Sequence, residues 1–241
     1  MTHVLYLDRY HLGDPLFLNG LARDVLGLGA PCLLVHGAGE AAERALEARG
    51  QVVRWDDGVL VAETAEDRTL VARAARNLNR QIAASLNEAG VAAIALEAGG
   101  RGLVVQDQAG VRAENVGWLR DLVVQRAVPV VAALTASDEA GVREVNGGAV
   151  AGALAAGLAD VGTEATVTML LKQPLRSREN GDSEHAWISL EELAAGALPE
   201  PEAVRAALRS GAEVGVVGRS GLRKPPLRGT AVRLAGSEKS P

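Results

Sequence analysis

The feature that most constrains the fold is the alternation of short apolar runs with longer amphipathic segments. The run VLYL (4–7) precedes a predicted helix over 15–28, and CLLVH (32–36) precedes a helix that we expect to end at Gly50. This alternation is typical of a parallel sheet with helices on both faces, so we predict an α/β protein. The other predicted elements are a hairpin over 51–63, a helix over 66–89, a buried strand over 91–96, a hairpin over 102–115, a helix over 115–126, strands over 129–134 and 166–171, a small-residue helix over 147–159, helical stretches within 189–210, a strand over 213–218 and a last edge strand over 227–235.

The composition adds limits to this prediction. Of the 241 residues 48% are hydrophobic but only 2% aromatic, so the core must be built from Ala, Val and Leu, which suit close packing of helices on a sheet. The net charge of −5 argues against nucleic acid or an anionic membrane as the main partner. No apolar run approaches the ~18–20 residues of a membrane span, so we expect a cytoplasmic protein.

Cysteine and histidine give no sign of a metal centre. Cys32 is the single cysteine, so no internal disulfide can form, and its apolar surroundings predict a buried, unreactive thiol. The four histidines, His3, His11, His36 and His185, lack the spacing of metal ligands. We therefore predict no metal site on these side chains.

The segment HGAGE, which joins the strand over 32–36 to the next helix, allows two interpretations. Backbone N–H groups at a helix start favour an anion, so Gly37, Ala38 and Gly39 could hold a phosphoryl group. A single G-x-G is also compatible with a tight turn that has no ligand. At this point the sequence leaves both interpretations open.

Four segments of the chain, together with the order of the elements, carry a resemblance to a known family: LLVHGAGE, the stretch over 67–96, EVNGGAVAGALAAGLA and RGTAV. They resemble the amino-acid kinase family, in particular N-acetylglutamate kinase and the carrier-protein-linked aminoadipate kinase. LLVHGAGE is similar to the family's L-V-H-G-G-G segment, and EVNGGAVAGALAAGLA is similar to N-V-N-A-D followed by an alanine-rich helix. The segment DRTLVARAARNLNRQIAASLNEAGVAAIAL resembles the family's long helix, and Asn79 stands at the position of the Asn of V-N-K. The order of elements and the ending RGTAV complete the resemblance, which spans nearly the whole chain.

The resemblance implies a three-layer α/β/α sandwich in a single domain over 1–241. The acyl-substrate lobe would take about 1–160, the nucleotide lobe about 161–235, and 236–241 would form a tail. It also implies ATP and Mg²⁺, transfer of a γ-phosphoryl to the side-chain carboxylate of an acylated amino acid, a homodimer, and a role in arginine or lysine biosynthesis. Catalysis in such an enzyme is positioning and charge stabilisation.

Several positions depart from the family's pattern. Tyr6 stands in place of the first lysine, and Gly148 in place of the Asp of N-A-D. No lysine lies near 198–200, where the second is expected, and no arginine lies within 60–63, where the family grips the substrate carboxylate. Lys172 is the first lysine of the chain, so shifting the alignment cannot restore a lysine in the first strand.

We therefore identify no catalytic residue of the family that this sequence retains. Arg9 and Lys172 are the candidate substitutes for the two lysines. The expected anion-binding residues are Gly37, Ala38, Gly39, Gly147 and Gly148, and the expected substrate-binding residues are Asn79 and Asn146. The glycines could equally remain for packing alone. ATP and Mg²⁺ follow from the resemblance and are disfavoured by these residues.

Three functions follow from this comparison. We expect a degenerate, non-catalytic relative of these kinases that binds an amino-acid derivative or a nucleotide. The alternative is an active, divergent ATP-dependent kinase of an acylated amino acid. The third hypothesis is a structural partner that dimerises with an active paralogue.

Overall fold

Eight strands form the central sheet of the computed structural model, in the order β12-β14-β13-β11-β1-β2-β8-β5. Their bounds are β1 Thr2–Leu7, β2 Cys32–His36, β5 Ala93–Glu97, β8 Val128–Ala132, β11 Ala165–Leu171, β12 Trp187–Ser189, β13 Val214–Gly218 and β14 Thr230–Arg233. Neighbouring strands are parallel except β13 and β14, which are antiparallel. The structure describes residues 1–12, 14–137, 141–171, 187–190, 198, 200–218, 222 and 230–233.

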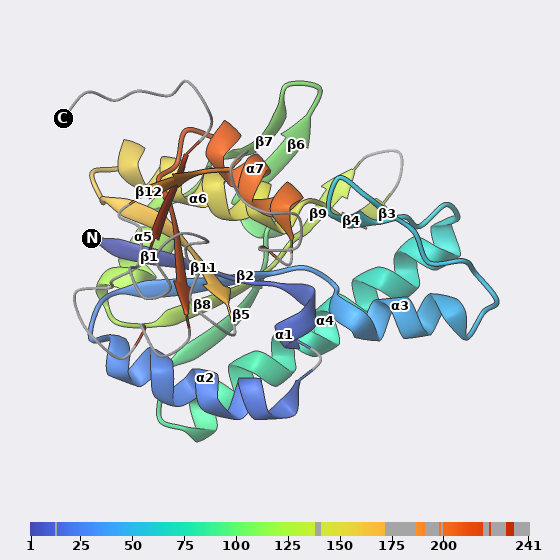
Figure 1. Cartoon of the computed structure of the whole chain (residues 1–241), viewed down its shortest axis with the longest axis horizontal. Coiled ribbons are helices and arrows are strands. Elements are labelled where there is room, and N and C mark those ends of the chain that lie inside the picture. Colours follow the sequence, from blue (N-terminus) through green and yellow to red (C-terminus); the bar gives the residue numbers. More distant parts are fainter. Residues whose placement is uncertain are drawn as a thin grey trace.

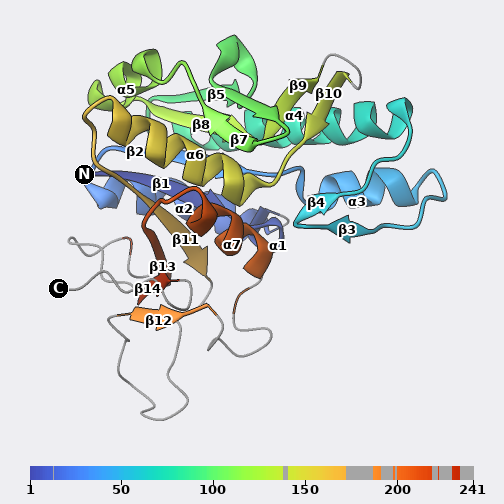
Figure 2. The ribbon, with the colours of Figure 1, turned by 90° about the horizontal axis from the view of Figure 1, so that it is seen from above.

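Helices cover both faces of this sheet, which gives the three layers that the resemblance implies (Figures 1 and 2). The helices are α1 Arg9–Leu12, α2 Pro15–Leu28, α3 Gly39–Glu47, α4 Ala65–Glu88, α5 Gly117–Val124, α6 Gly147–Asp160 and α7 Pro201–Arg209. Side chains of α2 and α4 form a core with one face of the sheet, and those of α5, α6 and α7 form a core with the other. The fold is thus a mainly parallel α/β/α sandwich.

The alternation of side chains along β1 shows how the sequence builds both cores. Val4 and Tyr6 belong to the core on the α6 side, whereas Leu5 and Leu7 belong to the core on the α2 side. Successive side chains of a strand point to opposite faces, so a strand buried on both faces reads as a continuous apolar run. This is why VLYL contains no polar alternation.

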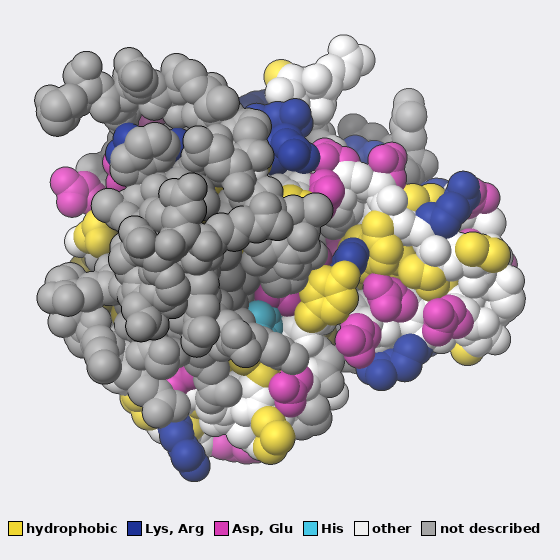
Figure 3. All heavy atoms as spheres, in the orientation of Figure 1, with side chains coloured by type: hydrophobic (Ala, Val, Ile, Leu, Met, Phe, Trp, Pro, Cys, Tyr) yellow, Lys and Arg dark blue, Asp and Glu magenta, His cyan; other side chains and the backbone are white. Residues whose placement is uncertain are grey.

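Three short hairpins project from the sandwich near the carboxyl ends of the strands. They are β3 Trp55–Asp56 with β4 Val59–Leu60, β6 Val104–Asp107 with β7 Gly110–Ala113, and β9 Leu134–Ser137 with β10 Gly141–Glu144. A third hydrophobic cluster joins the first and last of these hairpins to α3 and α4. Over α3 and α4, acidic and basic side chains are interspersed on the face in Figure 3.

Two predictions about strands at the sheet's edges are wrong. The strand predicted as buried over 91–96 is β5, which is the last strand of the sheet and leaves Ile94 38% exposed. The segment predicted as the edge strand contains β14, which lies between β13 and β12. Both errors concern strand order, which depends on long-range pairing and not on the local pattern. The predicted tail, 236–241, lies outside the described residues.

Candidate functional site

The parallel strands β1 and β2 bring the two expected halves of the site together. Tyr6 pairs with Val35 in the register of these strands, and Leu7 pairs with His36. The residues that follow each strand therefore meet at one edge of the sheet, where α/β proteins commonly bind ligands. This places Asp8 and Arg9 beside the corner formed by Gly37, Ala38 and Gly39.

The corner is occupied by a carboxylate of the protein itself. The backbone N–H of Ala38 donates a hydrogen bond of 2.6 Å to Oε1 of Glu144, which comes from the end of β10. The same oxygen lies so close to Gly37 that a Cβ atom there would be 2.6 Å from it. Glu144 thus takes a position that backbone N–H groups at a helix start would offer to an external anion.

Burial dominates the electrostatics of Glu144. Loss of water raises the pKa of this carboxyl to about 7, against hydrogen bonds from the backbone of Ala38 and Leu60 that favour the ionised form. The second oxygen, Oε2, is buried and has no hydrogen-bond partner among the described residues. Near neutral pH the corner therefore holds a carboxyl group that is close to its midpoint of protonation.

A second buried carboxyl group lies beside this corner. Tyr6 donates a hydrogen bond of 2.7 Å from its hydroxyl to Oε2 of Glu200, the residue before α7. Arg9 approaches the other oxygen, with Nε at 3.8 Å, and stacks its guanidinium 4.1 Å from the ring centre of Trp55. Burial raises the pKa of Glu200 to about 7 and holds the pKa of Tyr6 well above its usual range.

The third acidic group, Asp8, is committed to the start of α1. It accepts hydrogen bonds from the backbone N–H groups of Tyr10 and His11 and contacts the His11 ring at Nδ1. Among the described residues that line the corner cavity, Arg9 is the one with a cationic side chain; the others are Tyr6, Gly37, Ala38, Gly39, Trp55, Gly58, Glu144, Gly147 and Glu200. The cavity measures about 10 Å³, which is no more than the ~10–15 Å³ that one water molecule needs.

The predicted residues at the start of α6 make close contacts within the protein. Asn146 caps the helix by accepting a hydrogen bond from the Ala149 N–H, and it donates to the backbone oxygen of Asp57. At Gly148 a Cβ atom would lie 1.9 Å from the backbone oxygen of Ala203 in α7. The two helices can approach this closely because position 148 has no side chain.

Asn79 is also used within the protein. Its side-chain amide donates to the backbone oxygen of Leu96, and its oxygen lies 3.2 Å from Nε2 of His36. The side chain is 3% exposed. These contacts connect α4, β5 and the end of β2, and they occupy both the amide nitrogen and the oxygen that would meet a substrate.

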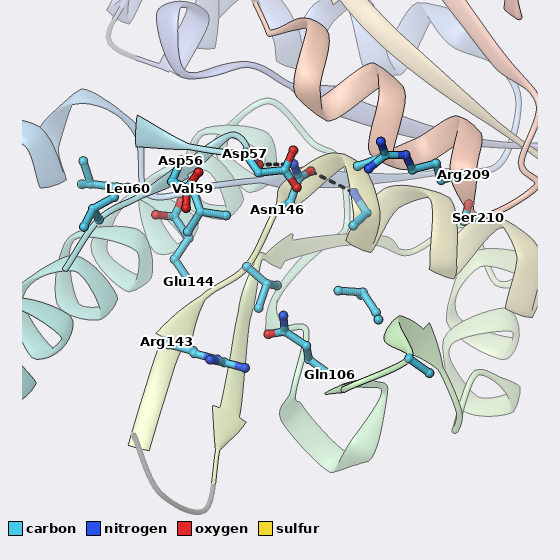
Figure 4. A pocket seen from close by; sticks show the side chains of 17 residues that line it. Asp56, Asp57, Val59, Leu60, Gln106, Arg143, Glu144, Asn146, Arg209 and Ser210 are labelled. Carbon is cyan, nitrogen blue, oxygen red and sulfur yellow. Dashed lines mark hydrogen bonds between the residues drawn. The ribbon is translucent and has the colours of Figure 1, made fainter. Parts of the chain in front are cut away.

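An open cleft of about 610 Å³ lies on the other side of Glu144 (Figure 4). Its walls come from the hairpins β3–β4 and β6–β7, the strand β10, and the helices α6 and α7. Asn146 lines it, as do two arginines, Arg143 and Arg209. The volume falls within the range of small-molecule sites.

The sequence analysis missed Glu144 and the two arginines of the cleft. Glu144 lies 106 residues from Ala38, so no local pattern joins them. One signal was present, because the Glu of EVN stands where the resembled family has the first Asn of N-V-N. Of the candidate substitutes for the lysines, Arg9 lies in the corner and Lys172 lies outside the described residues.

No cluster of three or more His, Cys, Asp or Glu side chains within the described residues could hold a metal ion. None of the described helices is long and apolar enough to cross a membrane.

Comparison with known proteins gives the following likenesses. No family profile matches the chain. It is 28% identical to the acetylglutamate kinase of Chloroflexus aggregans, over 91% of this chain and 93% of that one. It is 33% identical to the acetylglutamate kinase of Chloroflexus aurantiacus, where the match spans only 39% of this chain and 37% of the length of that enzyme. In structure it is similar to aspartate kinase from Synechocystis, with a TM-score of 0.67 and 18% identity over 96% of this chain and 40% of that one.

Proposed function

We propose that this amino-acid kinase-like protein is of the acetylglutamate or aminoadipate kinase type and binds its ligand without transferring phosphate. One observation carries the proposal: the carboxylate of Glu144 occupies the glycine corner, at 2.6 Å from the Ala38 N–H. A phosphoryl group would need the same N–H group.

The charges around the corner also disfavour a polyphosphate. Asp8, Glu144 and Glu200 are buried there, and Arg9 is the one cation that the described part of the chain contributes to the lining. Like charges at short range in a poorly solvated site repel strongly. Phosphoryl transfer depends on cations that are already aimed at the transferring group. The residues of the corner therefore do not fit ATP with Mg²⁺.

The alternative, an active divergent kinase, would need Arg9 and Lys172 to replace the two lysines. Arg9 is 19% exposed, lies near Glu200 and stacks on Trp55, so it has little freedom to follow a transferring phosphoryl group. Arginine is also a poor substitute for the compact point charge of a lysine. This favours the non-catalytic function.

In this proposal the acyl-substrate lobe, about 1–160, supplies most of the open cleft, and an amino-acid derivative binds there. The protein acts as a homodimer or together with an active paralogue, as a binding or regulatory subunit in arginine or lysine biosynthesis. Neither nucleic acid nor a membrane is a partner. We place it in the cytoplasm with such pathways.

The test compares the purified protein with the Chloroflexus aggregans acetylglutamate kinase under identical conditions. We expect no release of ADP and no acyl phosphate, trapped as a hydroxamate, from Mg-ATP with N-acetyl-L-glutamate or N-acetyl-L-aminoadipate. Mg-ATP should leave the melting temperature unchanged. Turnover at a rate close to that of the Chloroflexus enzyme, abolished by Gly39→Trp in the corner, would contradict the proposal.

A further inference from the structure

We propose that Glu144 and Glu200 form a proton-dependent latch, which holds the end of β10 and the start of α7 against the ends of β1 and β2. While the pair of carboxyls retains a proton, both stay in the corner. When both are ionised, the end of β10 and the start of α7 separate locally from the strand ends. The latch depends on the protonation of the protein itself, so it goes beyond the proposed function and holds whichever ligand the protein binds.

The two carboxyls join elements that are far apart in the sequence. Glu144 ends β10, and its Oε1 accepts a hydrogen bond from the N–H of Ala38, which follows β2 and lies 106 residues away. Glu200 precedes α7, and its Oε2 accepts a hydrogen bond from the hydroxyl of Tyr6 in β1, 194 residues away. The side chain of Glu200 makes no capping hydrogen bond to its own helix. Each side chain therefore ties its element to the end of a central strand.

Glu144 has an unmet hydrogen-bonding need that a proton relieves. Its Oε2 is buried and has no hydrogen-bond partner among the described residues. An ionised carboxylate that lacks donors on one buried oxygen is costly, and a proton on that oxygen removes the charge. The closed corner therefore favours the protonated form of this side chain.

The corner cavity leaves no room to solvate the two carboxyls when both are ionised. Both line this cavity, which measures about 10 Å³ and holds at most one water molecule. Ionised Glu144, Glu200 and Asp8 would face Arg9, the one cation that the described residues add to the lining. Burial, with a contribution from the neighbouring acids, raises the pKa of both glutamates. Separation of the elements would admit water and relieve the repulsion.

The other titratable groups on the corner side do not neutralise the pair. Tyr6 keeps its hydroxyl proton, because burial and the neighbouring carboxyls hold its pKa well above the usual range. His36 in β2 stays neutral, because burial lowers its pKa. Asp8 contacts the ring of His11 in α1. The proton of the pair is therefore held by the glutamates themselves.

The groups on the remaining elements also supply no net counter-charge. Glu43 of α3 accepts a hydrogen bond from Trp55, and Glu202 lies in the first turn of α7, so both add negative charge. Glu144 also lines the open cleft, where the other charged side chains of the described lining are two acids and two arginines, whose charges cancel: Asp56, Asp57, Arg143 and Arg209.

The latch connects the pH to the shape of the open cleft. Glu144 and the last turn of α7 both belong to the cleft wall, and Figure 4 shows Glu144 extending from the end of β10 towards the β3–β4 hairpin. The open form binds fewer protons than the closed form, so it gains population as the pH rises. We therefore infer a closed corner in acid and a looser cleft wall above neutral pH.

The experiment is hydrogen–deuterium exchange of the full chain between pH 5 and pH 8, followed by mass spectrometry. Labelling times are scaled to the exchange rate of unstructured peptides at each pH. The reporting peptides cover 141–146 and 200–205, and a peptide over 15–28, in α2, is the internal reference. The variants are Glu144→Gln, Glu200→Gln and the double variant, which keep an acceptor oxygen without the charge. Glu88→Gln, at the exposed end of α4, is the matched control.

We expect exchange in both reporting peptides of the native protein to be at least about tenfold faster at pH 8 than at pH 5 after this scaling, because opening releases protons. The reference peptide should change less. The single variants should show a smaller rise and the double variant none, with slow exchange at every pH. Glu88→Gln should behave like the native protein.

Native reporting peptides with no rise would overturn the latch, and this result needs no variant to fold. An equal rise in the α2 peptide would also overturn it, because the whole domain would then be opening. A native-sized rise in the double variant, with an unchanged melting temperature, would assign the titration to another group such as His11 and would contradict the latch as well. Phosphoryl transfer from ATP would contradict the proposed function and would not alter any of these outcomes.

Discussion

Glu144 is a buried carboxyl group that serves as a ligand for its own protein. Its oxygen accepts the Ala38 N–H, and its neighbours include two further acids, Asp8 and Glu200, with Arg9 as the nearby cation. A carboxyl group in such surroundings is stabilised by backbone dipoles when it is ionised and by burial when it is protonated. At the residue scale, the protonation state of Glu144 therefore depends on the balance between these two effects.

The first prediction concerns stability against pH. The pKa of Glu144 and that of Glu200 are each raised from 4.5 to about 7, so the folded protein binds more protons than the unfolded chain between these values. The contribution of these two groups to the free energy of unfolding is present at pH 4.5 and is lost as the pH rises to about 7. We expect this loss to be on the order of 2–3 kcal/mol for each group. The measurement is urea unfolding from pH 5 to pH 8.

Glu144→Gln keeps an oxygen for the Ala38 N–H and removes the titrating group. This variant should show a flatter dependence on pH than the native protein. The exposed residue Glu88, changed to Gln at the end of α4, should leave the dependence unaltered. A slope in Glu144→Gln equal to the native slope would assign the effect to other groups, such as Glu200.

The sequence could predict the strand-to-helix corner but not the side chain that occupies it. The motif HGAGE correctly predicted a strand followed directly by a helix, and Gly39 has the positive φ of 67° that favours glycine. Glu144 occupies the corner because the chain brings the end of β10 next to Ala38, which follows β2. Such a contact is set by tertiary structure, and only the change from Asn to Glu in E-V-N hinted at it.

At the scale of elements, the close approach of α6 and α7 fixes the shape of the site. Gly148 faces the backbone of Ala203, and Gly152 faces Ala207 and Ser210. This packing brings the start of α7 beside the corner, and Glu200 with it. The glycines of α6 therefore have a structural reason to be present without any phosphate.

The second prediction concerns this helix pair. In Gly148→Ala the added Cβ would meet the Ala203 backbone, which cannot move as a side chain can. We expect the free energy of unfolding to fall by about 1–3 kcal/mol, as is usual for overpacking, in spite of the better helix propensity of alanine. Chemical denaturation of both proteins measures the difference.

Gly117→Ala is the matched control, because a Cβ at this position of α5 meets nothing within 4 Å. It should be neutral or slightly stabilising. Equal stability of Gly148→Ala and Gly117→Ala would contradict the close packing of α6 on α7.

Element types were predicted well because the periodic patterns are long. The predicted helices over 15–28 and 66–89 correspond to α2 and α4, and the strand over 32–36 corresponds to β2. The predicted positions of β5 and β14 in the sheet were wrong. A strand in the middle of a sheet and a strand at an apolar edge can both be written as an apolar run, so the local pattern does not distinguish them. Exposure of Ile94 therefore could not be read from the run VAAIAL.

At the scale of the whole molecule, the sheet has one edge built from an apolar strand. Ile94 and Ala95 of β5 are exposed, and β5 pairs with β8 on one side only. Exposed apolar edges readily pair with another strand. We accordingly place the proposed homodimer contact at β5.

The third prediction tests this placement. In Ile94→Lys a charge replaces an apolar side chain at the edge. We expect the native protein to be a dimer and this variant to be a monomer, as measured by light scattering after size exclusion. Val124→Lys, at a still more exposed position on α5, should remain a dimer. A dimer in Ile94→Lys would place the contact on another surface.

The contacts between Tyr6, Arg9, Glu144 and Glu200 bear on the evolutionary history of the protein. Replacing Tyr6 with lysine, as in the resembled kinases, would remove the hydroxyl that bonds to Glu200 and would leave Glu144 in the corner. Side chains in one network do not change independently in their effect on stability. A lysine at position 6 would therefore not by itself free the corner, and the effects of substitutions at these four positions on stability need not add.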